Sequence, residues 1–293
     1  MQLIPSFISN SFNFIDVIVP LELLSTKAFG LLECEESACH DILIYNLFTQ
    51  LNLKECTRLG SINIRLKSIT NEPELLKRKI YFEKTFNPED WNRFYNLKVE
   101  DELEAWQTLP DTIGEIYKNS CQIVPDKNFS KTHVVVWIPK GMSINLFQEI
   151  LKKKLPNNPE GFNEVFDGIL EKYGDITTDK GEWIIMPKEI LPTSAKKKYS
   201  FQKNMIRQLN KNHHINYTFP KVLEVIICIT SIFFKSKIKI LPKQYTRCLE
   251  NIDVDSDGKT YKLIVGYSGT GLILNHGQFD NDRIGIAPTR KFI

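Results

Sequence analysis

Closely paired cysteines are missing from this sequence, although its 293 residues include six cysteines. Because no Cys-x-x-Cys pair occurs, the common zinc-knuckle and thioredoxin-like motifs are excluded. The six cysteines are scattered along a chain that is long enough to form a core without disulfide bonds. We therefore expect reduced thiols and no cofactor.

Basic residues are absent from residues 1–26, and long apolar runs are absent from the whole chain. A secretory signal peptide needs a basic segment before its apolar core, so this amino terminus does not match one. The longest largely apolar run, Val225–Phe234, is about half the length that crosses a bilayer. It predicts a buried helix in a soluble protein that has no membrane partner.

An excess of charge of one sign is also lacking, since 38 basic and 35 acidic residues give a net charge of +3. Domains that bind nucleic acids usually carry a clear basic excess, so the sequence predicts no nucleic-acid partner. Short lysine clusters, such as Lys152–Lys154 and Lys196–Lys198, are typical of solvated helix ends. A content of 42% hydrophobic and 11% aromatic residues favours a folded core over disorder.

Residues 41–80 contain a dense series of apolar side chains at helical spacing. In its first part, Leu43, Ile44, Leu47, Phe48 and Leu51 fall on one face of a helix. A segment of about 40 residues cannot bury this many apolar faces within itself. Part of this surface must therefore contact another body.

The segment resembles an F-box, the short helical motif that links a substrate receptor to the Skp-type adaptor of cullin ubiquitin ligases. The aliphatic, phenylalanine and leucine positions of that motif are matched by Leu43, Ile44, Leu47, Phe48, Leu51, Leu53, Leu59 and Leu75. The resemblance implies that these side chains bind the adaptor of a eukaryotic host. The apolar pattern also allows a second interpretation, in which the helices pack on the core of their own chain.

The remainder of the chain mixes strand and helix patterns. Dense apolar runs predict strands at 132–138, 182–187, 245–250, 260–267, 271–275 and 283–287. Apolar periodicity predicts helices at 143–155, 158–174, 199–209 and 220–234. Because strands and helices occur in mixed order and the chain ends in antiparallel strands, we expect an α+β fold behind a small helical module.

Several blocks in this part resemble an uncharacterised protein family of amoeba-infecting chlamydiae, among them THVVVWIP, EWIIMPKEILP and LIVGYSGTGL. The resemblance covers about residues 82–293 and carries no known reaction, cofactor or fold. It implies a bacterium that lives inside a eukaryotic cell. An effector in that setting would act in the bacterial cytoplasm or after secretion into the host cell.

Candidate catalytic residues are few. Cys121 and His133 could form a nucleophile and base pair, and Cys248 is a second candidate thiol. A reactive thiol needs its base within hydrogen-bonding reach and a third group that orients the base, which the sequence does not show. We therefore favour a structural role for all three residues and keep thiol catalysis as the alternative.

A possible calcium loop begins at residue 253. Asp253, Asp255 and Asp257 match the first three carboxylate positions of such a loop. Its twelfth position is Ile264 rather than glutamate, and the residues that follow the loop predict a strand instead of a helix. An acidic hairpin turn is therefore favoured over a metal site.

We expect four segments: a leader at 1–38, an F-box-like module at 39–82, a connector at 83–110 and an α+β domain at 111–293. The expected protein is a non-enzymatic substrate receptor that docks on a host Skp-type adaptor and holds an unknown target protein near the ligase. Two alternatives remain open. One is an enzyme of unknown reaction in the carboxy-terminal domain, and the other is a self-contained structural protein.

Overall fold

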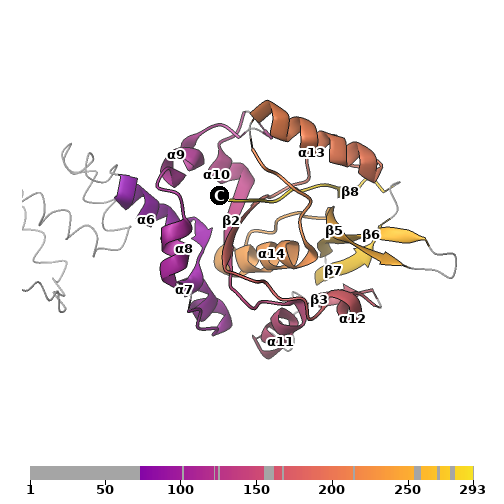
Figure 1. The fold of residues 1–293 in the computed structure, drawn as a ribbon, viewed down its shortest axis with the longest axis horizontal. Coiled ribbons are helices and arrows are strands. Elements are labelled where there is room, and N and C mark those ends of the chain that lie inside the picture. Colours follow the sequence, from indigo (N-terminus) through magenta and orange to yellow (C-terminus); the bar gives the residue numbers. More distant parts are fainter. Residues whose placement is uncertain are drawn as a thin grey trace, which may run out of the picture. The chain divides into compact units, whose positions relative to one another are not determined.

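Two mixed β-sheets and a buried helix between them give the chain an α+β fold (Figure 1). The computed structural model describes residues 73–100, 102–121, 123–124, 126–154, 162–166, 168–213, 215–253, 259–268, 271–277 and 281–292. All of these residues belong to one unit, Asn71–Ile293. The greater part of the predicted F-box-like module, residues 39–72, lies outside the described residues.

The first sheet has four strands in the order β1-β2-β4-β9. They are β1 (Thr85–Phe86), β2 (His133–Ile138), β4 (Glu182–Pro187) and β9 (Arg290–Lys291). β1 runs parallel to β2, whereas β4 is antiparallel to both β2 and β9. Every residue of β2 is buried, as expected for a continuous apolar strand that is covered on both faces.

The second sheet has five strands in the order β3-β7-β6-β5-β8. They are β3 (Phe162–Val165), β7 (Gly271–His276), β6 (Thr260–Ser268), β5 (Tyr245–Asp253) and β8 (Ile284–Gly285). β5, β6 and β7 pair antiparallel, as predicted, and the two outer strands are parallel to their neighbours. Leu263, Val265 and Leu274 on one face join the main core, and the alternate residues point to the other face.

Helix α14 (Val222–Ser236) lies between the two sheets and contacts strands of both. Its residues from Val222 to Ile232 are all buried. A helix that is apolar on all sides has to be covered on all sides, which is why the sequence predicts a buried helix here. Among the described residues, no helix combines the length and the apolar character needed to span a bilayer.

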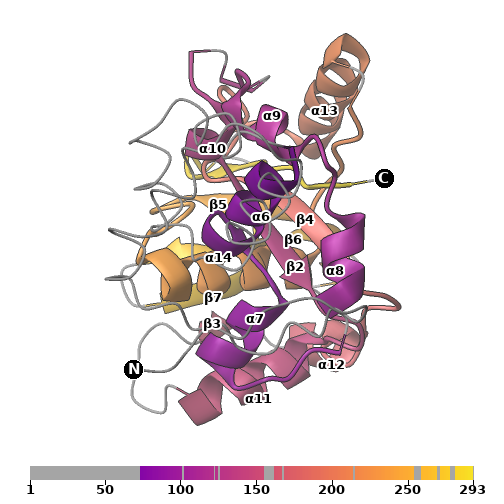
Figure 2. The same cartoon turned by 90° about the vertical axis from the view of Figure 1, so that its left-hand side faces the viewer.

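Several short helices cover the outer side of the first sheet, which faces the viewer in Figure 2. They are α6 (Pro73–Glu83), α8 (Glu102–Thr108), α9 (Ile113–Lys118) and α10 (Phe129–Thr132). Aromatic contacts hold this layer, since the Tyr81 ring lies 5.2 Å from Trp106 and 5.9 Å from Trp183, both edge-to-face. The other helices are α7 (Pro88–Asp90), the π-helical turn η1 (Trp91–Tyr95), α11 (Ile144–Lys154), α12 (Ile169–Tyr173) and α13 (Tyr199–His213).

Residues 83–110, which the sequence suggests as a connector, contribute to the core of the described unit. Phe86, Trp91, Tyr95 and Leu109 are all at most 3% exposed. The Trp91 indole nitrogen donates a hydrogen bond to the Trp137 carbonyl at 2.8 Å, which attaches this segment to β2. The aromatic side chains of this segment thus pack in the core.

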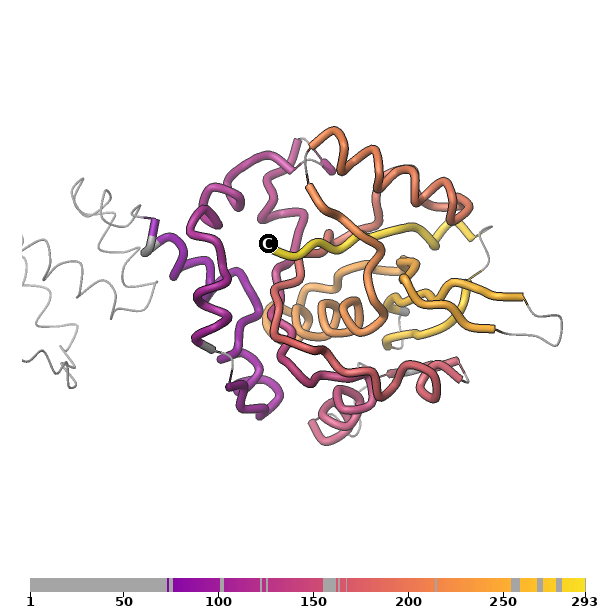
Figure 3. Tube along the Cα trace, in the orientation of Figure 1, coloured from indigo at the N-terminus to yellow at the C-terminus, as the bar shows by residue number. Residues whose placement is uncertain are grey.

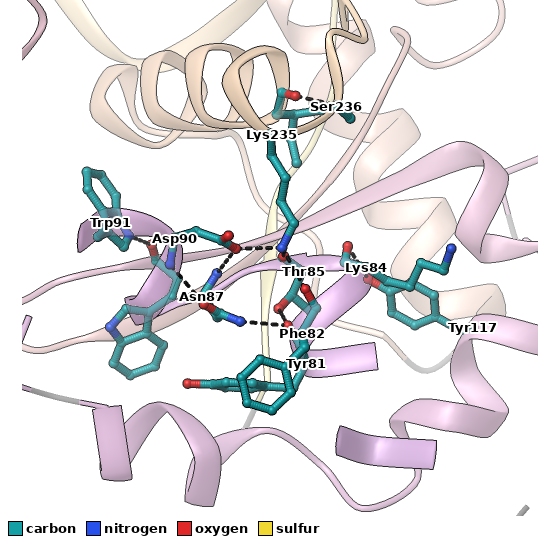
Figure 4. Close-up of polar contacts among 12 residues, drawn as sticks. Tyr81, Phe82, Lys84, Thr85, Asn87, Asp90, Trp91, Tyr117, Lys235 and Ser236 are labelled. Atoms are coloured by element: carbon teal, nitrogen blue, oxygen red, sulfur yellow. Dashed lines mark hydrogen bonds and ion pairs between the residues drawn. The ribbon is translucent and has the colours of Figure 1, made fainter. Parts of the chain in front are cut away.

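A partly buried lysine fastens α14 to the first strands (Figure 4). Lys235 Nζ donates to the carbonyl oxygens of Phe82 and Thr85 at 2.9 and 2.6 Å, and to Asp90 Oδ2 at 2.6 Å. Asp90 also closes the capping box of α7 with Asn87. All three donors of the ammonium group are therefore used within the protein.

Figure 3 shows the last residues of the chain running from the second sheet back to the first. β8 pairs with β5, and β9 then pairs with β4. The helix predicted over 158–174 is wrong in its first half, because residues 162–165 form strand β3 beside β7. Gly168, with a φ of 84°, ends this extended stretch before α12 begins.

Candidate functional site

A short loop brings Cys121 next to the first residue of β2. Cys121 follows α9, and its amide donates to the Lys127 carbonyl at 2.8 Å. Ser120 and Asn128 form an isolated antiparallel bridge, so the chain between them folds back on itself. The helical turn α10 then leads directly into His133. Two residues that are twelve positions apart thereby meet at one edge of the first sheet.

The thiol of Cys121 has three polar neighbours, of which two are amide donors. Its Sγ is 3.8 Å from His133 Nδ1. The amides of Ile123 and Val124 both donate to Sγ at 3.3 Å. Backbone amides aimed at a sulfur atom stabilise negative charge on it, and this is an element of activated thiols. The structure thus brings Cys121 and His133 together, as the alternative interpretation of the sequence requires.

Both nitrogens of the His133 ring have oxygen neighbours. Tyr217 OH lies 3.0 Å from Nε2, and Thr132 Oγ1 lies 2.9 Å from Nδ1. The Phe129 ring stacks on the imidazole with centroids 4.3 Å apart. The Arg290 guanidinium lies 5.6 Å from the ring centroids of both Phe129 and Tyr217. We call Cys121, Thr132, His133 and Tyr217 the thiol–imidazole cluster.

Burial sets the protonation state of this cluster. Burial, together with the positive charges of Arg290 and Lys188, lowers the pKa of His133 from 6.5 to about 3. Burial also raises the pKa of Tyr217. At neutral pH the cluster therefore contains a neutral imidazole and a neutral phenol. A neutral imidazole has one donor and one acceptor nitrogen, which suits its two hydroxyl neighbours.

The thiol, imidazole and phenol of the cluster are closed to solvent, and Thr132 at its edge is partly buried. Cys121 and Tyr217 are each 1% exposed, and His133 is 3% exposed. A nucleophilic thiol has to come within bonding distance of the atom it attacks, so a protein substrate would need the loop at residues 121–128 to open. In the conformation described, these side chains satisfy one another and pack beneath α10 and the end of α13.

Cys248, the third candidate, is in a different environment. It lies on β5 within the main core and is fully buried. Burial raises the pKa of its thiol, and the nearby Glu250 and Glu224 raise it further. Its Sγ lies 3.8 Å from the Thr246 carbonyl. A protonated core thiol of this kind is structural.

The possible calcium loop connects two strands. Asp253 ends β5 and pairs with Thr260 at the start of β6, whose hydroxyl donates to Asp253 Oδ1 at 2.7 Å. That hydrogen bond and the Lys172 ammonium lower the pKa of Asp253. Asp255 and Asp257 lie outside the described residues. Strand β6 occupies the position at which an EF-hand calcium site needs its second helix. The described residues contain no group of three or more side chains that could hold a metal ion.

Most of the predicted adaptor-binding residues lie outside the described part of the chain. They are Leu43, Ile44, Leu47, Phe48, Leu51, Leu53 and Leu59, and the side chain of Leu75 is also outside it. The end of the predicted module is helix α6, which packs on α9 and β1. Ile80 and Tyr81 are buried in the core, with Leu76 packed against it. The last turns of α6 thus belong to the unit 71–293.

The outer face of the second sheet carries an open groove that sequence reasoning missed. It has a volume of about 690 Å³ and lies over the alternate residues of the strands. Its lining includes Tyr245, Ile264, Ile273, Asn275, Glu164 and Lys196. The sequence signal for it is the alternation in β6 and β7, where Ile264 and Ile273 point away from α14. We call this feature the outer-sheet groove.

No family model matches the chain, and no curated protein or solved structure matches it significantly.

Proposed function

We propose that the protein is a non-enzymatic substrate receptor, whose residues 39–72 dock on a Skp-type adaptor and whose unit 71–293 holds a target protein. The observation that carries the proposal is the apolar order of Leu43, Leu47, Phe48 and Leu51, which resembles the first helix of an F-box. Such a receptor acts by proximity, because it raises the local concentration of target lysines at the ligase.

Two features of the described unit support this proposal. The outer-sheet groove is open and combines apolar residues, such as Ile264 and Ile273, with polar ones, such as Asn275 and Tyr245. A concave surface of mixed polarity suits an extended segment of a protein partner. The burial of Cys121 and His133 supports a binding role over a thiol reaction.

Co-purification with a recombinant Skp-type adaptor tests the proposal. The full chain should capture the adaptor, and Phe48→Asp should abolish the capture because a charge would enter an apolar interface. Phe201→Asp is a matched control, since Phe201 lies on α13 with 49% of its surface already exposed. Capture that survives Phe48→Asp, or no capture by the natural sequence, would contradict the proposal.

A thiol-dependent enzyme is the second candidate, and the geometry of the thiol–imidazole cluster favours it. Sγ lies 3.8 Å from a neutral imidazole and accepts two amide hydrogen bonds. An enzyme of this kind has to expose Cys121 in its working state. Iodoacetamide labelling followed by peptide mass spectrometry separates the two candidates.

The receptor predicts that the peptide containing Cys121 is labelled only after the chain is unfolded. The enzyme predicts labelling of Cys121 in the native protein, and a lower labelling rate in His133→Gln. Cys228 is fully buried in α14 and serves as an internal control that reports global unfolding.

A further inference from the structure

The charge of this chain is unevenly distributed. Residues 190–223 contain seven basic residues and no acidic residue, which leaves −4 on the rest of a chain whose net charge is +3. An overall charge near zero thus hides one strongly basic segment. Charge asymmetry of this kind indicates contact with an anionic partner.

Helix α13 carries three of these seven basic residues on one face. Its inner face packs through Gln202 and Ile206, which are at most 5% exposed. Its exposed outer face is polar except for Phe201 at one margin, and its polar residues are Ser200, Lys203, Asn204, Arg207, Gln208 and Lys211. Lys203, Arg207 and Lys211 recur every four residues and so form a straight row along the helix. α13 lies at the rim of the unit (Figure 1), and all three basic residues of the row are exposed.

The basic row has no acidic partner in the part of the chain that the structure describes. Lys203, Arg207 and Lys211 form no ion pair, in contrast to Lys152 on α11, which pairs with Glu149 at 3.4 Å. Like charges four residues apart repel each other and destabilise a helix. α13 nevertheless has three basic residues at this spacing, and three more lysines precede it at 196–198. This arrangement favours the binding of an external anion.

We propose that α13 binds duplex DNA, with its outer face in the major groove and its basic row on the phosphates. A B-DNA major groove is about 12 Å wide and accepts one α-helix. Asn204 and Gln208 stand beside the basic row, and side-chain amides of this kind read adenine edges. An anionic membrane fits less well, because Tyr199, Met205, Ile206 and Leu209 pack on the core and Phe201 is the one large apolar side chain that α13 exposes in the described structure.

A fluorescence anisotropy titration of the full chain with a labelled 20-base-pair duplex tests the proposal. The affinity is measured over a series of salt concentrations, and the logarithm of the binding constant is plotted against the logarithm of salt. Each phosphate contact adds about −0.9 to the slope of this plot. The triple variant Lys203→Gln, Arg207→Gln, Lys211→Gln should therefore reduce the slope by about 2.7.

The matched control is Lys152→Gln, Lys153→Gln, Lys154→Gln, which removes the same charge from exposed residues of α11. This control should keep the slope of the natural sequence. Asn204→Ala with Gln208→Ala should leave the slope unchanged while weakening the discrimination between duplexes of different sequence. Circular dichroism of each variant checks that it is folded.

Three results would overturn the proposal. One is equal loss of slope in both triple variants, which would indicate only a response to net charge. Another is no binding of the duplex at low salt. The third is binding to vesicles containing phosphatidylserine without binding to the duplex, which would assign the basic row to a membrane surface.

Discussion

The buried histidine of the thiol–imidazole cluster makes the stability of this protein depend on pH in a predictable direction. His133 is 3% exposed, and its pKa in the folded chain is about 3, compared with 6.5 for an ordinary histidine. As the pH falls, the unfolded chain therefore binds a proton at this position at a higher pH than the folded chain does. The contribution of His133 to the free energy of unfolding is fully present above pH 6.5. It is lost as the pH is lowered towards 3, and it does not change further below that value.

The size of the effect follows from proton linkage. Within the window between the two pKa values, one additional proton on the unfolded state lowers the free energy of unfolding by about 1.4 kcal/mol per pH unit. Integrated from about pH 7 to about pH 5, His133 alone costs about 2 kcal/mol. This is a large part of the 5–15 kcal/mol that is typical of a folded domain, so about 2 kcal/mol is readily measured.

Other groups contribute with the opposite sign. Burial raises the pKa of Glu224 and of Glu250, so the folded state takes up protons there as the pH falls. The comparison with His133→Gln removes these contributions, because both proteins share them. Glutamine keeps a polar side chain at this position but does not titrate. The variant should be less stable at neutral pH and should show a flatter dependence on pH.

Urea unfolding monitored by circular dichroism at half-unit steps of pH provides the measurement. The difference in free energy of unfolding between the natural sequence and His133→Gln should shrink by about 2 kcal/mol from pH 7 to pH 5. His213→Gln is the matched control, because this residue is exposed at the end of α13. A difference between the natural sequence and His133→Gln that is constant over this range would show that the imidazole is not held neutral, and the account of the cluster would fail.

Two further variants test the packing of α6 and α14. Lys235→Met should destabilise the protein by about 3–5 kcal/mol in urea unfolding, because it leaves the buried Asp90 carboxylate without its counter-ion. Asp90→Asn in the same chain should recover part of that loss. Gly114→Ala should destabilise by about 1–3 kcal/mol, although helix propensity alone would favour alanine, because the added Cβ would overlap the Leu76 side chain. Leu76→Ala should relieve that overlap, and an unchanged penalty in the double variant would show that α6 does not pack on α9 in this way.

The parts of the fold with a strong local pattern could be predicted from the sequence. α14 is apolar on every side, and β2 and β4 are dense apolar runs, so that burial alone decides their structure. The strand predicted at 283–287 contains β8, although only two of its residues pair. β1 and β9 could not be predicted, because each has two residues and forms only through pairing with distant strands. The error at 162–165 has the same cause, since pairing with β7 overrides a helical apolar spacing.

The candidate site was predictable in its residues but not in its geometry. A thiol and a histidine twelve positions apart can be chosen from the sequence, and the structure places them 3.8 Å apart. The role of Tyr217 could not be inferred, because 84 residues separate it from His133. The burial of Cys121 and His133 could not be predicted either, since Phe129 stacks over the imidazole only in the folded chain.

The position of the thiol–imidazole cluster explains why polar groups lie in this part of the core. Tyr217 follows the end of α13, where the Asn210 side chain binds both its amide and its carbonyl at 2.8 Å. Thr218 and Thr289 exchange backbone hydrogen bonds at 2.8 and 3.0 Å, which brings Arg290 beside Tyr217.

The cluster is thus the point at which the loop at 120–133, the end of α13 and the last strand meet. Hydrogen bonds have to match in direction as well as in distance, so such a junction fixes one arrangement of three segments more sharply than apolar contact does. This role accounts for the burial of Cys121 without a reaction. It also leaves the outer-sheet groove and the basic row of α13, both open to solvent, as the two surfaces of the unit 71–293 to which we assign the proposed target protein and the proposed duplex.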